Sequence, residues 1–257
     1  MVHRPAPRPA RGFVLVHGGA HGPWCWDKLV PLLNHPAAAI ELPGRTAVSD
    51  VPPRPLRLAD YSTAVVDGVD AAGFDEVVLV GHSLGGLTLT AAAGLLGERV
   101  KHVVYVAAMV AGRPGAPIDL LPQPLRAVVR RRLARPGGGS GGHLELPAWV
   151  VRRYFCNGLD DADARTVREL VCPEPTAPLL ERGQGPTLPA HLPRTYIGFR
   201  SDRAIPHFMQ RRFASRIGTS PVRLDGGHDG MIGNAAGLAA LLNGIAAMAQ
   251  VRVDGRW

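Results

Sequence analysis

The stretch Val77-Val78-Leu79-Val80-Gly81-His82-Ser83-Leu84-Gly85-Gly86 decides the fold of this chain, because it places a serine between a buried strand and a helix. An apolar run precedes the turn, and the small and apolar residues up to Ala93 continue it as a helix. A side chain at the apex of such a turn projects its hydroxyl from the sheet, and the backbone two residues to either side passes too close for a Cβ atom. Gly81 and Gly85 occupy those two positions. The pattern predicts a nucleophile elbow with Ser83 at its apex.

Short apolar runs alternate with helical patterns along the rest of the chain. Runs that end in turns lie at 13–16, 37–42, 103–108, 195–199 and 221–224, in addition to 77–80. Helical patterns lie at 26–33, 60–72, 208–213 and 235–249, and Asp60 is the expected N-cap of the second. This alternation is typical of parallel strands joined by right-handed crossovers. We therefore predict an α/β fold, a mostly parallel twisted sheet flanked by helices, with the functional site at the carboxyl edge of the sheet.

The alternation breaks down between residues 109 and 190, where prolines punctuate the chain. Helical patterns at 125–133 and 161–171 lie on either side of a glycine-rich linker at 137–142. We interpret 109–190 as a small, mainly helical cap inserted over the sheet edge. Residues 12–108 and 191–257 then form the core, and residues 1–11, rich in Pro, Ala and Arg, form a disordered tail.

Composition narrows the possible partners and compartments. The 257 residues carry a formal net charge of +8, but nearly all basic residues are arginine, a bias typical of a GC-rich genome. The arginine cluster at 126–135 lacks the interleaved aromatic residues that stack on bases. No apolar stretch is long enough for a signal peptide or a membrane span, and the 3 cysteines have no disulfide or zinc pattern. We expect a cytoplasmic protein with a small-molecule substrate and without nucleic-acid or membrane partners; the sequence leaves its oligomeric state open.

Two loop residues are candidates to activate Ser83. A serine hydroxyl is a weak nucleophile at neutral pH, so acyl transfer needs a neutral imidazole as base and a carboxylate that orients the imidazole. Asp202 follows the apolar run at 195–199, and His228 follows the run at 221–224. Both are therefore expected on loops at the edge that carries Ser83, and the order Ser, Asp, His along the chain is the one expected for an elbow serine.

Other acidic residues compete with Asp202 for the role of orienting acid. Asp225 and Asp229 lie too close in sequence to His228 to reach its far ring nitrogen easily, and Asp119 lies in the predicted cap. Asp202 is the preferred candidate.

Backbone N–H groups are expected to stabilise the oxyanion that forms when Ser83 attacks a carbonyl group. The residue after the nucleophile, Leu84, can supply one N–H, and Gly19, on the loop after the first strand, can supply the other. His17 and His21 lie on the same loop. We interpret these two histidines as structural groups that hydrogen-bond the loop backbone.

Three segments resemble those of a known family. The opening Phe13-Val14-Leu15-Val16-His17-Gly18-Gly19-Ala20-His21-Gly22-Pro23-Trp24-Cys25-Trp26 resembles that of the α/β-hydrolases grouped with plant methylesterases and hydroxynitrile lyases. Residues 202–210 and Gly227-His228-Asp229-Gly230-Met231 are similar to the acid and histidine segments of that group. The resemblance covers both ends of the chain and the elbow but not residues 112–188. It implies the α/β-hydrolase fold and the chemistry of one of these two enzyme types.

The resemblance also distinguishes the two activities. Hydroxynitrile lyases of this group carry a threonine where this chain has Gly18, and a lysine directly after the catalytic histidine, where this chain has Asp229. An anionic Asp229 would not stabilise a departing cyanide. Our first hypothesis is therefore a serine carboxylic-ester hydrolase that forms an acyl-enzyme on a small or medium ester. Two alternatives remain open: a lyase or cyclase that uses His228 as a base without an acyl-enzyme, and a ligand-binding receptor.

The cap is poor in aromatic residues, which leaves few candidates for an aromatic pocket wall. Trp149, Tyr154 and Phe155 are the main ones. The hydrolytic mechanism needs no cofactor, and no spacing of histidine, cysteine or acidic residues predicts a metal site.

Overall fold

A six-stranded sheet forms the centre of the molecule in the computed structural model, which describes residues 10–45, 54–112, 114–134, 142–182 and 187–253. The strand order is β2-β1-β3-β4-β7-β8, and all five pairings are parallel. The strands are β1 (Arg11–Val16), β2 (Ala37–Ile40), β3 (Glu76–His82), β4 (Val100–Val106), β7 (Arg194–Phe199) and β8 (Val222–Leu224). The predicted parallel α/β architecture is confirmed.

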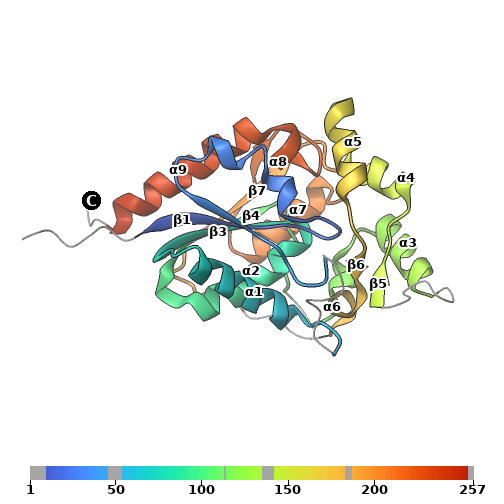
Figure 1. Cartoon of the computed structure of the whole chain (residues 1–257), viewed down its shortest axis with the longest axis horizontal. Helices are drawn as coiled ribbons and strands as arrows, with labels where there is room; N and C mark the ends of the chain where they lie inside the picture. The colour runs from blue at the N-terminus through green and yellow to red at the C-terminus, as the bar shows by residue number, and fades with distance from the viewer. Residues whose placement is uncertain (1–9, 46–53, 113, 135–141, 183–186, 254–257) are drawn as a thin grey trace, which may run out of the picture.

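Helices cover both faces of this sheet, which is why its central strands are apolar on both sides. Helices α1 and α2 pack side by side on one face, and α9 lies on the other (Figure 1). Val14, Leu15 and Val16 of β1 are consequently all fully buried. The helices outside the segment 109–190 are α1 (Leu58–Ala71), α2 (Gly86–Leu96), α7 (His207–Arg216), α8 (Gly230–Gly233) and α9 (Ala235–Val253), with single turns η1 (Pro23–Trp26), η2 (Val30–Leu32), η4 (Ser83–Gly85) and η5 (Gly97–Arg99).

Two helical predictions differ in detail from the structure. The helix expected at 26–33 is replaced by the separate turns η1 and η2, because Pro31 lacks the N–H group that a continuous helix would need. Helix α1 begins at Leu58 rather than after Asp60. Asp60 still stabilises the start of this helix, since its carboxylate accepts a hydrogen bond from the backbone N–H of Arg57 at 2.7 Å.

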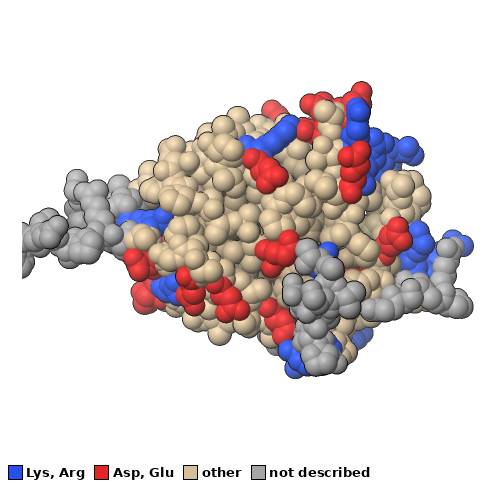
Figure 2. Space-filling model, in the orientation of Figure 1, with Lys and Arg blue, Asp and Glu red and all other residues tan. Residues whose placement is uncertain are grey.

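The segment 109–190, called the cap segment below, lies at one end of the sheet (Figure 1). It contacts loops at the carboxyl ends of the strands; for example, the backbone N–H of Cys172 donates to the carbonyl oxygen of Ala20 at 3.0 Å. Charged side chains of both signs surround this end, while most of the core surface in view is uncharged (Figure 2). The cap elements are η6 (Pro117–Leu120), α3 (Gln123–Leu133), β5 (His143–Leu144), α4 (Ala148–Val150), η8 (Val151–Phe155), α5 (Asp161–Leu170), β6 (Glu174–Pro175) and α6 (Thr176–Leu180).

Two sequence predictions fall largely outside the described residues. These are the disordered tail 1–11, of which the structure describes residues 10 and 11, and the glycine-rich linker 137–142, of which it describes residue 142. The tail boundary needs a correction: Arg11 is the first residue of β1, where its guanidinium pairs with Glu76 on the neighbouring strand β3. Across the described ranges, no helix has both the length and the apolar character needed to span a bilayer.

Candidate active site

Ser83 lies at the tip of the turn between β3 and α2, with a backbone φ of +50° that is uncommon for a residue other than glycine. The two flanking glycines allow this turn. A Cβ atom on Gly85 would lie 2.4 Å from the carbonyl oxygen of His17, and one on Gly81 would lie 2.8 Å from the Leu89 side chain. The close approach of the chain at these two positions is the geometry that a nucleophile elbow requires.

A chain of hydrogen bonds links Ser83 to the two loop residues. The Oγ atom of Ser83 lies 3.0 Å from Nε2 of His228, and Nδ1 of His228 lies 2.9 Å from Oδ2 of Asp202. The second oxygen, Oδ1, accepts the backbone N–H groups of Ala204 and Ile205 at 2.8 Å each. These bonds fix the carboxylate, which in turn fixes the imidazole with Nδ1 protonated and Nε2 free to accept the serine proton.

The surroundings of His228 determine its proton affinity. Burial by itself lowers the pKa of this imidazole, but the charge of Asp202 and its hydrogen bond, with a further contribution from Asp229, raise the pKa above its ordinary value. The neighbouring His82 behaves differently: burial, reinforced by the nearby His228 and His21, holds its pKa well below the ordinary value. Of these two rings, His228 is the one suited to accept a proton during a reaction.

The competing acids have other partners. Oδ2 of Asp229 lies 3.0 Å from Nε2 of His21. Asp225 is exposed and pairs with Arg200, and Asp119 pairs with Arg130 within the cap segment. Of the acids considered from the sequence, the structure brings Asp202 to the ring nitrogen of His228 that faces away from Ser83. Both Asp202 and His228 are buried.

The loop after β1 faces the elbow. Gly19 and Leu84 both line the cavity that contains Ser83, and Leu84 lies in the first turn after the serine, where backbone N–H groups lack acceptors within the helix. His17 and His21 bond this loop as expected from the sequence: Nδ1 of His17 donates to the carbonyl oxygen of Gly18 at 2.9 Å, and Nδ1 of His21 donates to that of Gly19 at 2.8 Å.

The cavity at Ser83 holds about 560 Å³ of space free of protein atoms, part of it open to solvent. Aliphatic side chains from the cap segment form much of its wall. The described lining residues with polar side chains are Ser83, His228 and Glu174. The aliphatic cap residues that line it are Leu121, Leu125, Val129, Leu144, Leu146 and Leu179. Such a wall favours an uncharged, apolar substrate group.

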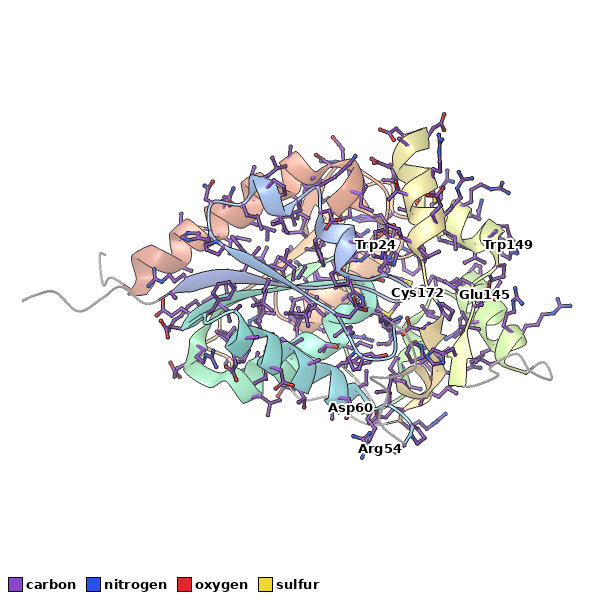
Figure 3. All side chains as sticks on the ribbon, in the orientation of Figure 1. Trp24, Arg54, Asp60, Glu145, Trp149 and Cys172 are labelled. Carbon is purple, nitrogen blue, oxygen red and sulfur yellow. The ribbon has the colours of Figure 1, made fainter. Side chains whose placement is uncertain are left out.

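The three aromatic candidates occupy different positions. Phe155 lines the cavity, and its ring stacks against that of His228 with 5.8 Å between centroids. Tyr154 is buried but is not among the residues lining the cavity. Trp149 is 48% exposed and lies on the outer side of the cap segment (Figure 3). The pocket wall that the sequence assigned to aromatic residues is mainly aliphatic, with Phe155 as the aromatic contributor from the cap segment.

One acid in the cavity wall, Glu174, was not predicted from the sequence. Glu174, in β6, is buried, and its Oε2 accepts the backbone N–H of Ala20 at 2.6 Å. Both carboxylate oxygens also accept hydrogen bonds from the buried guanidinium of Arg45, one of them at 2.8 Å. The one available signal was the position of Glu174 between Pro173 and Pro175, which excludes it from the exposed face of a helix.

A further cap residue reaches the loops that carry the acid and the histidine. The side-chain amide of Asn157 donates to the carbonyl oxygen of Ser201 at 2.7 Å. The backbone carbonyl oxygen of Asn157 packs closely on Gly227: a Cβ atom added to Gly227 would lie 1.6 Å from it. Asn157 thus contacts the residues directly before Asp202 and His228.

One group of side chains within the described ranges has donor atoms close enough to hold a metal ion. The donor atoms of His82, His228 and Asp229 lie within 4.8 Å of one another. Ser83 and Asp202 already engage both ring nitrogens of His228, so a metal bound there would displace a bond of the Ser83–His228–Asp202 chain. The arrangement fits proton transfer from a serine better than metal binding.

Comparisons with known proteins identify the family of this chain. The family described as "Alpha/beta hydrolase family" matches residues 13–241. Methylesterase 9 of Arabidopsis thaliana is 33% identical over 233 residues, covering 82% of this chain and 86% of the relative. An alpha-hydroxynitrile lyase of the same plant is 34% identical over 117 residues, and the match covers 42% of this chain and 44% of the lyase.

Among solved structures, an extracellular alpha/beta-hydrolase from a Paenibacillus species superposes with a TM-score of 0.78 at 23% identity, covering 90% of this chain and 97% of its own. At that identity the likeness shows the fold. The sequence relatives confirm the resemblance to the methylesterase and hydroxynitrile lyase group.

Proposed function

Because this chain belongs to the α/β hydrolase family, we propose that it is a serine carboxylic-ester hydrolase whose nucleophile is Ser83. The observation that carries the proposal is the 3.0 Å approach of Ser83 Oγ to His228 Nε2 at the wall of an apolar cavity. Methylesterase relatives support ester hydrolysis as the reaction type.

In the proposed mechanism, His228 accepts the Ser83 proton as Oγ attacks the ester carbonyl carbon. The carbonyl oxygen becomes an oxyanion that accepts hydrogen bonds from the backbone N–H groups of Gly19 and Leu84. His228 then donates its proton to the alcohol leaving group, and water hydrolyses the acyl-enzyme by the same route. Asp202 holds the imidazole in position throughout.

The cavity wall supports a substrate class. Since aliphatic side chains line most of it, and since both carboxylate oxygens of Glu174 are already bound by Arg45, we propose a small or medium ester whose group in this cavity is apolar and uncharged. In domain terms, we propose that residues 109–190 act as the cap over a core of 11–108 and 191–257. The expected cytoplasmic location, the lack of a cofactor and the lack of nucleic-acid partners remain predictions.

The structure favours hydrolysis over cyanohydrin cleavage. Asp229 stands where the lyases carry lysine, and its side chain is fully buried against His21 rather than lining the cavity. A Cβ atom on Gly18, where the lyases carry threonine, would lie 2.9 Å from Cβ of Ser83. Neither lyase side chain has a counterpart here.

A fluorophosphonate probe and a chromogenic ester test the proposal. The probe should label Ser83, and Ser83→Ala should lower p-nitrophenyl ester turnover by several orders of magnitude. Ser62→Ala is the matched control, since Ser62 is a buried serine of α1 that hydrogen-bonds backbone outside the cavity. Hydrolysis in heavy-oxygen water should place the label in the released acid. Undiminished turnover by Ser83→Ala, or unlabelled acid, would refute the mechanism.

A further inference from the structure

Glu174 is the one charged cap residue among the described side chains that line the cavity, and protein groups already bind both of its carboxylate oxygens. Its carboxylate accepts hydrogen bonds from the backbone N–H of Ala20 and from the guanidinium of Arg45. Arg45 is itself buried, and although burial lowers the pKa of its guanidinium, the neighbouring Glu174 raises the pKa overall, so the guanidinium stays charged. The carboxylate is therefore fixed between the cap segment, the core and the loop after β1.

The residue that Glu174 holds has an unusual conformation. Ala20 has a φ of +58°, in the left-handed region that residues other than glycine seldom adopt. The cap segment bonds both polar groups of its backbone: Glu174 accepts from its N–H, and the backbone N–H of Cys172 donates to its carbonyl oxygen at 3.0 Å. Strained residues persist where their surroundings over-determine them, and they cluster at functional sites.

The position of Ala20 connects this contact to the reaction. Ala20 directly follows Gly19, whose N–H is one of the two proposed oxyanion donors. The contact at Gly19 is close, because a Cβ atom there would lie 3.3 Å from Oε2 of Glu174. A donor must lie within a few tenths of an ångström of its position to stabilise the oxyanion fully. Any relaxation of Ala20 would therefore rotate or shift the Gly19 N–H.

We propose that Glu174, held by Arg45, is a positioning residue: the cap segment uses it to keep Ala20 left-handed and thereby to direct the Gly19 N–H at the oxyanion. This inference rests on the proposed ester hydrolysis. It gives the cap segment a part in stabilising the transition state, in addition to forming the substrate wall.

The test compares two cap carboxylates that make the same kind of contact at different places. Glu181 accepts the backbone N–H of Leu58 at 2.7 Å and pairs with Arg57, but it does not line the cavity at Ser83. Glu174→Ala should lower kcat on a p-nitrophenyl ester by about 10- to 100-fold, less than complete loss of a donor, with KM nearly unchanged. Glu181→Ala should leave kcat unchanged. Glu174→Gln retains an acceptor for Ala20 and should recover part of the lost kcat.

Inhibitor binding separates positioning from general damage. The Oγ atom of Ser83 adds to the carbonyl carbon of a trifluoromethyl ketone, and the serine proton passes to His228. The former carbonyl oxygen then carries the negative charge, as it does in the transition state. The affinity for this ketone should fall in Glu174→Ala by the same factor as kcat/KM, whereas the affinity for the matching unreactive alcohol should stay constant. Thermal melting of each variant reports the folded fraction, and Glu174→Gln provides the comparison if Glu174→Ala does not fold.

The outcomes distinguish this inference from the proposed function. A wild-type protein that neither hydrolyses esters nor reacts with a fluorophosphonate would overturn both. If the wild type is active and Ser83→Ala is inactive, but neither Glu174 variant changes kcat, the positioning role alone is wrong. An equal loss in the Glu174 and Glu181 variants, or an equal loss of affinity for ketone and alcohol, would also overturn it, because cap stability or substrate binding would then account for the effect.

Discussion

Replacing Gly85 by alanine should damage both the fold and the reaction, because the added Cβ meets backbone on the opposite loop. That atom would lie 2.4 Å from the carbonyl oxygen of His17 and 2.9 Å from that of Val16. Ordinary contact begins at 3.4 Å, so the elbow and the loop after β1 must separate by about 1 Å. Neither partner is a flexible side chain that can turn away.

The magnitude follows from this displacement. Overpacking of a tight site costs about 1–3 kcal/mol, and about 2–4 °C in Tm per kcal/mol for a chain of this size, so Tm should fall by about 2–12 °C. A misplacement of about 1 Å between nucleophile and oxyanion donors can lower kcat by about 100-fold. Circular dichroism melting and p-nitrophenyl ester kinetics measure the two effects.

Gly94→Ala is the matched control. Gly94 lies in the exposed part of helix α2, and a Cβ atom there would meet nothing within 4 Å. Alanine should therefore stabilise the helix by about 0.5–1 kcal/mol and leave kcat unchanged. The steric reasoning would be refuted if Gly85→Ala matched the wild type in both Tm and kcat, or if both substitutions shifted Tm in the same direction.

Three further predictions concern the reaction itself. Since the neutral form of His228 accepts the serine proton and its pKa is raised, kcat/KM should fall with decreasing pH with a midpoint above the ordinary imidazole value of 6.5; a flat profile between pH 5 and 8 would contradict this. Leu84→Ala keeps its backbone N–H and should barely change kcat, whereas Gly19→Pro removes one and should lower kcat by about 100- to 1,000-fold, measured on the same ester. Leu125→Trp should fill the cavity, so that kcat/KM falls about fourfold for each acyl methylene it excludes while acetate esters react as before; a uniform loss for all esters would show that Leu125 does not bound the acyl chain.

The framework of the site could be predicted from the sequence because it follows from strand ends. Each apolar run that stops at a turn places its next residues at the same sheet edge, so Ser83, Asp202 and His228 could be selected without knowledge of any contact between them. The elbow glycines were recognisable for a local steric reason that depends only on neighbouring residues.

The cap could not be predicted in the same way, because its interactions are long-range and irregular. Arg45 and Glu174 meet across 129 positions in the sequence, with no periodicity that links them. Trp149 shows the converse: its residue type suggested a pocket wall, but the direction of its side chain depends on how the short helix α4 packs on its neighbours, and it faces outward. Residue type alone does not determine which side of an insertion faces the core.

The contacts of the cap segment with the core loops constrain how this protein can be altered. Within the described residues, the cap segment contacts the loop after β1 at Ala20, the loop after β7 at Ser201 and the loop after β8 at Gly227. A shortened protein without this segment would keep the strands of its sheet but lose the cap contacts with all three loops. We therefore expect that a cap grafted from a relative will work only when the cap residues that contact these three loops are transferred with it. Substrate selectivity and catalytic rate would then change together.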